Sequence, residues 1–197
     1  MTQPAAVRGR AAPSPSAVGF LTVVRHEQHG LFGGLLLLNM SGRPLEFHCT
    51  APVKPNRAQE ILFGPTLEPY LFGEQIGRAL VTQCQGSLEA VLTDQESVLA
   101  AREFIDPPMV LVRQPVETVS QDGSGKVVQL RFDQAHTSHS PTGIFRIGRN
   151  TLATAAGFST DETVVASKLA TIGDRFDLWE PFSRIREAIE EAQRSGR

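Results

Sequence analysis

The stretch GFLTVVRHEQHGLFGGLLLLNMSGRPLEFHCTAPVKPNRAQEILF, residues 19–63, decides the fold that the rest of the chain extends. Residues 19–25 have the pattern of a strand, residues 31–39 form an almost unbroken apolar run, and residues 45–50 alternate between apolar and polar side chains. Alternation is typical of a strand covered on one face, and an apolar run is typical of a strand covered on both. The stretch therefore predicts a three-stranded antiparallel meander with its second strand at the centre.

Helix and strand patterns follow this meander. Pro52 and Pro55 end the sheet, and Asn56 is a good N-cap for the next helix. The remaining sequence predicts helices over 57–63 and 66–84, a strand–helix–strand unit over 87–113 whose helix Asp94 caps, a hairpin over 116–132, a strand over 144–148, and helices over 159–172 and 181–193.

These elements predict the fold class α+β. We expect a single α+β domain over residues 18–197, in which the N-terminal antiparallel three-stranded meander continues into a mixed sheet packed against helices. Residues 1–17 are rich in Ala, Pro and Ser. They cannot bury enough apolar surface to offset the entropy of ordering, so we expect a disordered tail.

Net charge, cysteine content and the length of apolar runs limit the partners and the compartment that fit the chain. The net charge is −2 and the pI is near 6.2, which argues against nucleic acid as a partner, although a local basic patch is compatible with these values. The two cysteines, Cys49 and Cys84, do not form a spaced framework, which favours a reducing compartment. No apolar run approaches the roughly 20 residues that span a bilayer. We therefore expect a soluble cytoplasmic protein with no membrane partner.

The meander holds three of the five histidines. In an antiparallel meander the first turn and the end of the third strand lie at one edge, so His26, Glu27 and His29 are expected near His48. Imidazole and carboxylate both ligate divalent transition metals, so His26, His29 and His48 are candidate metal ligands. The alternative is that they are exposed turn histidines, since their order is not the helical His-Glu-x-x-His motif.

The same edge is a candidate anion site. Arg25, Lys54 and Arg57 are expected to cluster there, beside the amides of the helix that follows Asn56. Together with Glu27 they form the candidate ligand-binding set.

Complete catalytic motifs are absent from the sequence. Asp122 to Lys126 lacks the first glycine and the Ser or Thr of a phosphate loop, and neither a dinucleotide fingerprint nor a nucleophile elbow occurs. Residues 153–169, ATAAGFSTDETVVASKL, resemble a helix-turn-helix segment, but the second helix begins with Asp161 and Glu162, which would repel phosphates.

Two functional hypotheses follow. The first is a non-catalytic binding or assembly module that pairs its strands with a protein partner or a second copy. The alternative is a small metal-dependent or anion-binding hydrolase with its site at the edge of the N-terminal meander.

Overall fold

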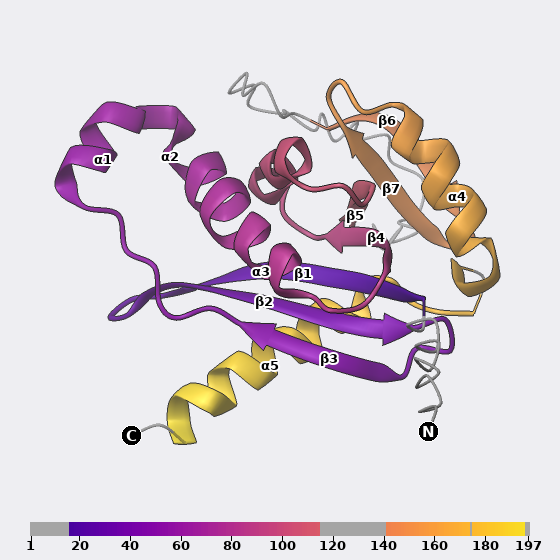
Figure 1. The fold of residues 1–197 in the computed structure, drawn as a ribbon, viewed down its shortest axis with the longest axis horizontal. Coiled ribbons are helices and arrows are strands. Elements are labelled where there is room, and N and C mark those ends of the chain that lie inside the picture. The colour runs from indigo at the N-terminus through magenta and orange to yellow at the C-terminus, as the bar shows by residue number, and fades with distance from the viewer. Residues whose placement is uncertain (1–15, 115–140, 174, 196–197) are drawn as a thin grey trace, which may run out of the picture.

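The computed structural model describes residues 16–114, 141–173 and 175–195 (Figure 1). Its strands form one seven-stranded sheet in the order β3-β2-β1-β4-β5-β7-β6. The strands are β1 (Ala17–His26), β2 (Gly30–Asn39), β3 (Pro44–Cys49), β4 (Leu88–Thr93), β5 (Met109–Arg113), β6 (Pro141–Ile147) and β7 (Asn150–Ala155). The expected meander is present close to its predicted bounds.

The sheet is mixed. β1, β2 and β3 pair antiparallel, with Phe20 opposite Leu36 and Leu35 opposite His48. β4 runs parallel to β1, and β5 runs parallel to β4, so the strand–helix–strand unit is also present. β7 and β6 complete the sheet with antiparallel pairing. The predicted fold class is therefore confirmed: an antiparallel meander continues into a mixed sheet packed against helices.

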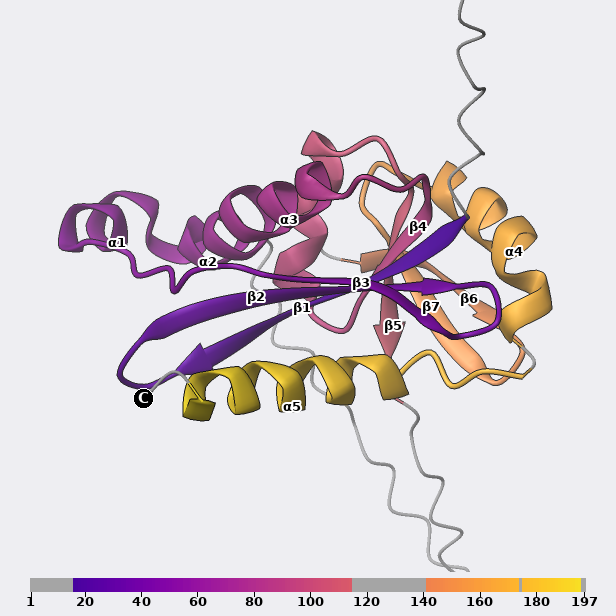
Figure 2. The same ribbon diagram turned by 60° about the horizontal axis from the view of Figure 1, so that its bottom comes forward.

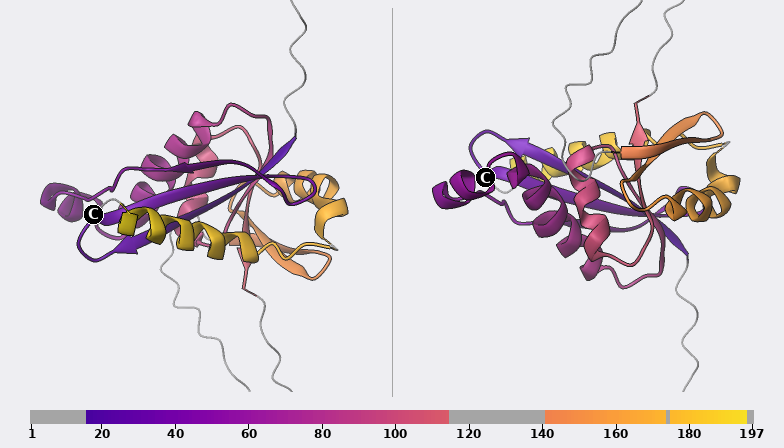
Figure 3. Two further views of the ribbon diagram at one scale, coloured as in Figure 1. Left: turned by 90° about the horizontal axis from the view of Figure 1, so that it is seen from below. Right: turned by 90° about the horizontal axis from the view of Figure 1, so that it is seen from above.

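Helices cover both faces of the sheet. They are α1 (Arg57–Phe63), η1 (Gly64–Thr66), α2 (Leu67–Pro69), the π-helix η2 (Tyr70–Gly77), α3 (Arg78–Gln83), the 3-10 helix η3 (Glu96–Phe104), α4 (Thr160–Gly173) and α5 (Glu180–Ser195). One buried core lies between the sheet and η2, α3 and η3, and a second lies between the sheet and α4 and α5. Figure 2 shows α3 and α5 on opposite sides of the meander, and in Figure 3 α5 lies along β1 and β2. We call these the α3 face and the α5 face.

Two adjacent glycines of β2 allow both helical layers to approach the sheet. A Cβ atom on Gly33 would lie 2.1 Å from Ile76 Cγ2, and one on Gly34 would lie 2.4 Å from Ile185 Cγ2. Ile76 and Ile185 are fully buried on the α3 face and the α5 face, respectively. Successive residues of a strand point to opposite faces, so Gly33 leaves room for Ile76 on the α3 face and Gly34 leaves room for Ile185 on the α5 face.

Substituting Gly33 with valine should destabilise the fold. The added side chain has no room beside Ile76, and overpacking a filled core typically costs about 1–3 kcal/mol. Urea denaturation should therefore show a loss of about 2 kcal/mol for Gly33→Val. Gly86→Ala is the control, because its Cβ would meet only Glu46 Oε1, at 3.9 Å. Equal stability of the two variants would contradict the close packing on β2.

The helical connections differ from the sequence prediction in two places. The segment expected as one helix over 66–84 changes from α2 through η2 to α3, and Gly73 packs so closely that a Cβ there would lie 2.6 Å from Ala101 N. Asp94 does not cap η3, whose N-cap is Gln95, because its carboxylate pairs with Arg186 instead.

The region that resembles a helix-turn-helix begins inside a strand. β7 covers Asn150–Ala155 and pairs with both β5 and β6, so the would-be first helix of that motif does not exist. The predicted hairpin over 116–132 lies outside the described residues, as does most of the expected N-terminal tail. No helix in the described part of the chain is long and apolar enough to cross a membrane.

Candidate functional site at the edge of the meander

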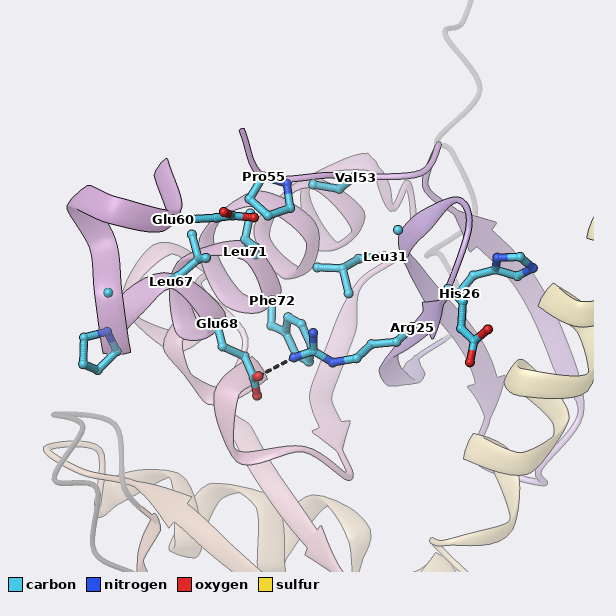
Figure 4. Close-up of a pocket in the computed structure, with 14 residues that line it drawn as sticks. Arg25, His26, Leu31, Val53, Pro55, Glu60, Leu67, Glu68, Leu71 and Phe72 are labelled. Carbon is cyan, nitrogen blue, oxygen red and sulfur yellow. Dashed lines mark hydrogen bonds and ion pairs between the residues drawn. The ribbon is translucent and has the colours of Figure 1, made fainter. Parts of the chain in front are cut away.

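A pocket of about 710 Å³ lies at the edge of the meander where the sequence predicted a site. It is bounded by the end of the β1–β2 hairpin, by the segment after β3, and by the arm that α1, η1 and α2 form (Figure 4). Figure 2 shows this arm and the hairpin turn at the same end of the molecule. The volume is within the usual range for small-molecule sites.

Apolar side chains make up much of the pocket lining. They are Leu31, Val53, Leu67, Leu71 and Phe72. Leu31, Leu71 and Phe72 are also buried in the core on the α3 face, so rigid elements support the pocket. Val53 is positioned by its backbone, which pairs with that of Leu31 after β3 has ended.

One cation and three carboxylates line the same pocket. They are Arg25, Glu27, Glu60 and Glu68. Arg25 extends from β1 towards Glu68 of α2, with which it forms an ion pair (Figure 4). The guanidinium carbon also lies 5.1 Å from the centre of the Phe72 ring, within the range of a cation–π contact. The opposite side of the Glu68 carboxylate accepts a hydrogen bond from Ser97 Oγ at 2.7 Å.

The other residues of the candidate ligand-binding set have different positions. Glu27 lines the pocket, whereas Lys54 donates to the carbonyl of Gln28 and Arg57 pairs with Glu60 at 3.0 Å. Neither Lys54 nor Arg57 is among the residues that line the pocket.

The helix start expected to supply amides is occupied. Asn56 does cap α1: its Oδ1 accepts from Gln59 N at 2.9 Å, and Gln59 Oε1 accepts from Asn56 N at 3.0 Å. This capping box occupies two of the amides at the helix start, those of Asn56 and Gln59, and α1 has only seven residues. Among the described residues that line the pocket, the one cation is Arg25.

His26 stabilises the β1–β2 turn. Its Nδ1 accepts hydrogen bonds from the backbone amides of Gln28 and His29, both at 3.2 Å. In the neutral ring this assigns the proton to Nε2. The His29 ring lies beside it at a tilt of 46°, with ring centres 4.6 Å apart.

His48 lies on the other face of the sheet from His26. Its Nε2 lies 2.8 Å from Glu46 Oε2, and it pairs across the ladder with Leu35, whose side chain is in the core on the α3 face. His26 instead packs near Phe32, on the α5 face. The structure thus brings His26 and His29 together but not His48, and no group of three or more His, Cys, Asp or Glu able to hold a metal occurs among the described residues.

Both cysteines are free, and both thiols are disfavoured as thiolates. Burial raises the pKa of Cys49, and burial together with the negative charge of Glu46 raises the pKa of Cys84 to about 11. Neither thiol is therefore activated as a nucleophile near neutral pH.

A second polar cluster lies where β4 ends and its parallel pairing with β1 stops. Asp94 follows β4, its side chain is only 1% exposed, and it pairs with Arg186 of α5, which also lies 3.5 Å from Thr22 Oγ1. The carboxyl ends of parallel strands are common ligand sites. Here the guanidinium covers the carboxylate, so the cluster is a closed ion pair.

Sequence reasoning missed the contacts of Glu68 with Arg25 and Ser97, and it missed the ion pair of Asp94 with Arg186. Arg25 and Glu68 are 43 positions apart, and Asp94 and Arg186 are 92 apart. Neither pair has a local motif. The one available signal was the helical spacing of Leu67 and Leu71, which puts Glu68 on a neighbouring face of the same arm.

Comparison with known proteins adds distant structural matches. The sequence matches no protein-family profile and no curated protein. Human ENDOV superposes with a TM-score of 0.46 and 13% identity over 91% of this chain and 85% of that chain. An endonuclease V variant from Ciona intestinalis, bound to a 23mer DNA that contains an inosine followed by a ribo-adenosine, gives 0.46 and 11% over 89% and 86%. A second Ciona intestinalis endonuclease V, with a 24mer DNA, gives 0.43 and 10% over 89% and 87%.

These matches contradict two of the sequence predictions. The structures that superpose on most of the chain are nucleases, two of them bound to DNA, whereas the sequence predicted a non-catalytic binding or assembly module with no nucleic-acid partner. A net charge of −2 is a sum over the whole chain and does not report on one surface. Since the identities are 13% or less and the TM-scores are below 0.5, no residue role rests on this likeness.

Proposed function

We propose that the chain is a hydrolase that acts on esters of phosphoric acid in the pocket at the meander edge. The observation that carries the proposal is the combination, in one apolar-lined pocket, of the Arg25 guanidinium with carboxylates that differ in their partners. Nucleic-acid strands and nucleotides are the first substrates to test. Nucleic acid is included because two of the structures that superpose on the chain hold DNA.

The side chains of Arg25 and Glu27 suit two different tasks in the hydrolysis of a phosphoester. The planar guanidinium of Arg25 can bind two oxygens of a phosphoryl group and stabilise the charge that develops on them. Glu27 lines the pocket and has no ion pair within the described part of the chain. An unpaired carboxylate can accept a proton from attacking water, so Glu27 is the proposed general base.

The proposal does not use a metal ion. The predicted ligands His26 and His48 lie on opposite faces of the sheet, and His26 Nδ1 already accepts two backbone amides. A cytoplasmic location remains part of the proposal, because two free cysteines suit a reducing compartment.

Phosphoester hydrolysis is the direct test. The purified protein is incubated with single-stranded and duplex oligonucleotides and with bis(nitrophenyl) phosphate, each with added divalent metal and with chelator. We expect cleavage of at least one substrate, and a fall in kcat/KM of about tenfold or more for Arg25→Gln, because a charge-assisted hydrogen bond contributes about 1.5–3 kcal/mol.

Arg57→Gln is the matched control. It removes an equal charge from an exposed arginine of the neighbouring arm that does not line the pocket, so kcat/KM should be unchanged. Absence of hydrolysis across the panel, or equal losses in the two variants, would refute the proposed function at this pocket.

A further inference from the structure

Glu68 is held from two sides inside the proposed site. Its Oε2 accepts from Arg25 Nη2, and its Oε1 accepts from Ser97 Oγ at 2.7 Å. The three residues come from β1, α2 and η3, which are far apart in the sequence. The Arg25 guanidinium, to which an anionic ligand would bind, is therefore already paired with a carboxylate.

The ion pair is open to exchange. The side chains of Arg25 and Glu68 are 64% and 48% exposed, respectively. An ion pair in such contact with water contributes little stability, because solvent screens both charges and holding two long side chains costs entropy. A ligand anion can thus replace Glu68 on Arg25, while Ser97 continues to hold the released carboxylate.

The surroundings of Arg25 define the rest of the ligand. The guanidinium lies over the Phe72 ring, and Leu31, Leu67 and Leu71 line the same pocket. A group bound by Arg25 would place its attached body against these apolar side chains. Water-sized or purely charged anions would leave that surface uncovered, so they gain little from the pocket.

We propose that the Glu68 carboxylate occupies the position on Arg25 that the acidic group of the ligand takes when it binds. The pocket then selects molecules that carry one phosphate, sulfonate or carboxylate on an apolar or aromatic body. This inference rests on the proposed function for the position of the site and names its substrate class. Glu68 sets the selectivity: its carboxylate competes with weakly held anions and is displaced only by those whose body also fills the pocket.

Paired fluorescent probes test the recognition of the anion. Anilinonaphthalene sulfonate and phenylnaphthylamine share an aromatic body and differ in the sulfonate. The wild-type chain should bind the sulfonate more tightly than the neutral probe. Arg25→Gln should remove this preference and leave the neutral probe unaffected. Glu68→Gln, which keeps an acceptor for Ser97, should tighten sulfonate binding about threefold, as expected from loss of a weak competing ion pair.

Glu180→Gln is the matched control for Glu68. Glu180 is also about half exposed and paired with an arginine, Arg184, but it does not line the pocket, so its neutralisation should leave the binding of both probes unchanged. Competition then separates the two kinds of body: displacement by AMP but not adenosine supports an aromatic body, and displacement by octyl phosphate but not octanol supports an aliphatic one. Either result supports the inference.

Three results would overturn it: equal binding of the two probes by the wild type, no gain for Glu68→Gln, or an equal gain for Glu180→Gln. These outcomes are separate from those of the hydrolysis assay. Selective probe binding without cleavage would refute the proposed hydrolase activity and support the role of Glu68. Cleavage with no effect of Glu68→Gln on probe binding would support the hydrolase activity and refute the role of Glu68.

Discussion

Replacing Asp161 with alanine should lower the free energy of unfolding by about 3–5 kcal/mol, the usual cost of breaking a buried ion pair. The Asp161 side chain is 4% exposed and receives two hydrogen bonds from Arg102, from Nε at 2.6 Å and from Nη2 at 3.1 Å. It also accepts from Met109 N at 3.0 Å. Its loss would leave a buried guanidinium and a buried amide without their acceptor.

Urea denaturation followed by circular dichroism measures this effect. Glu190→Ala is the control: it also removes a paired carboxylate, but Glu190 is 59% exposed and lies 3.7 Å from Arg194, so its loss should be below about 1 kcal/mol. If Asp161→Ala does not fold, the double variant Arg102→Met with Asp161→Leu should, because it leaves no uncompensated charge. A loss for Asp161→Ala no larger than that of Glu190→Ala would contradict a buried structural pair.

Asp161 illustrates which parts of the fold the sequence could predict. Its position in the first turn of α4 followed from local patterns, as did the strands of the meander and the Asn56 cap. Its partner Arg102 lies 59 positions away, and no periodicity connects the two. The π-helical turn at Tyr70–Gly77 was also missed, and Gly73 within it packs against Ala101 of η3, a contact between segments that local patterns do not predict.

The candidate site was predictable in location and less so in composition. The pocket lies at the edge of the meander that the sequence singled out, and Arg25 and Glu27 line it. Whether His26 and His48 converge depends on strand register. His26 pairs with Gly30 and His48 with Leu35, and residues five apart on one strand face opposite ways. The sequence contains no signal that sets both registers, so it could not separate the two histidines.

Arg186→Met should lower the free energy of unfolding by about 3 kcal/mol, near the lower end for a broken buried pair. The Asp94 side chain is 1% exposed, and its Oδ1 has no hydrogen-bond partner in the part of the chain that the structure describes. Arg186 is the cation that compensates it. Methionine retains much of the aliphatic stem of Arg186, so the measured loss reports on charge more than on packing.

Arg184→Met is a closely matched control. Arg184 lies on the same helix, its side chain is also 35% exposed, and its Nε lies 3.0 Å from Glu180, whose side chain is 49% exposed. The two substitutions therefore differ mainly in the burial of the carboxylate that is left behind. Thermal and urea unfolding should show little change for Arg184→Met, and adding Asp94→Asn to Arg186→Met should recover much of the lost stability. Equal losses for the two arginines, or no recovery in the double variant, would mean that Asp94 does not carry a buried charge that needs Arg186.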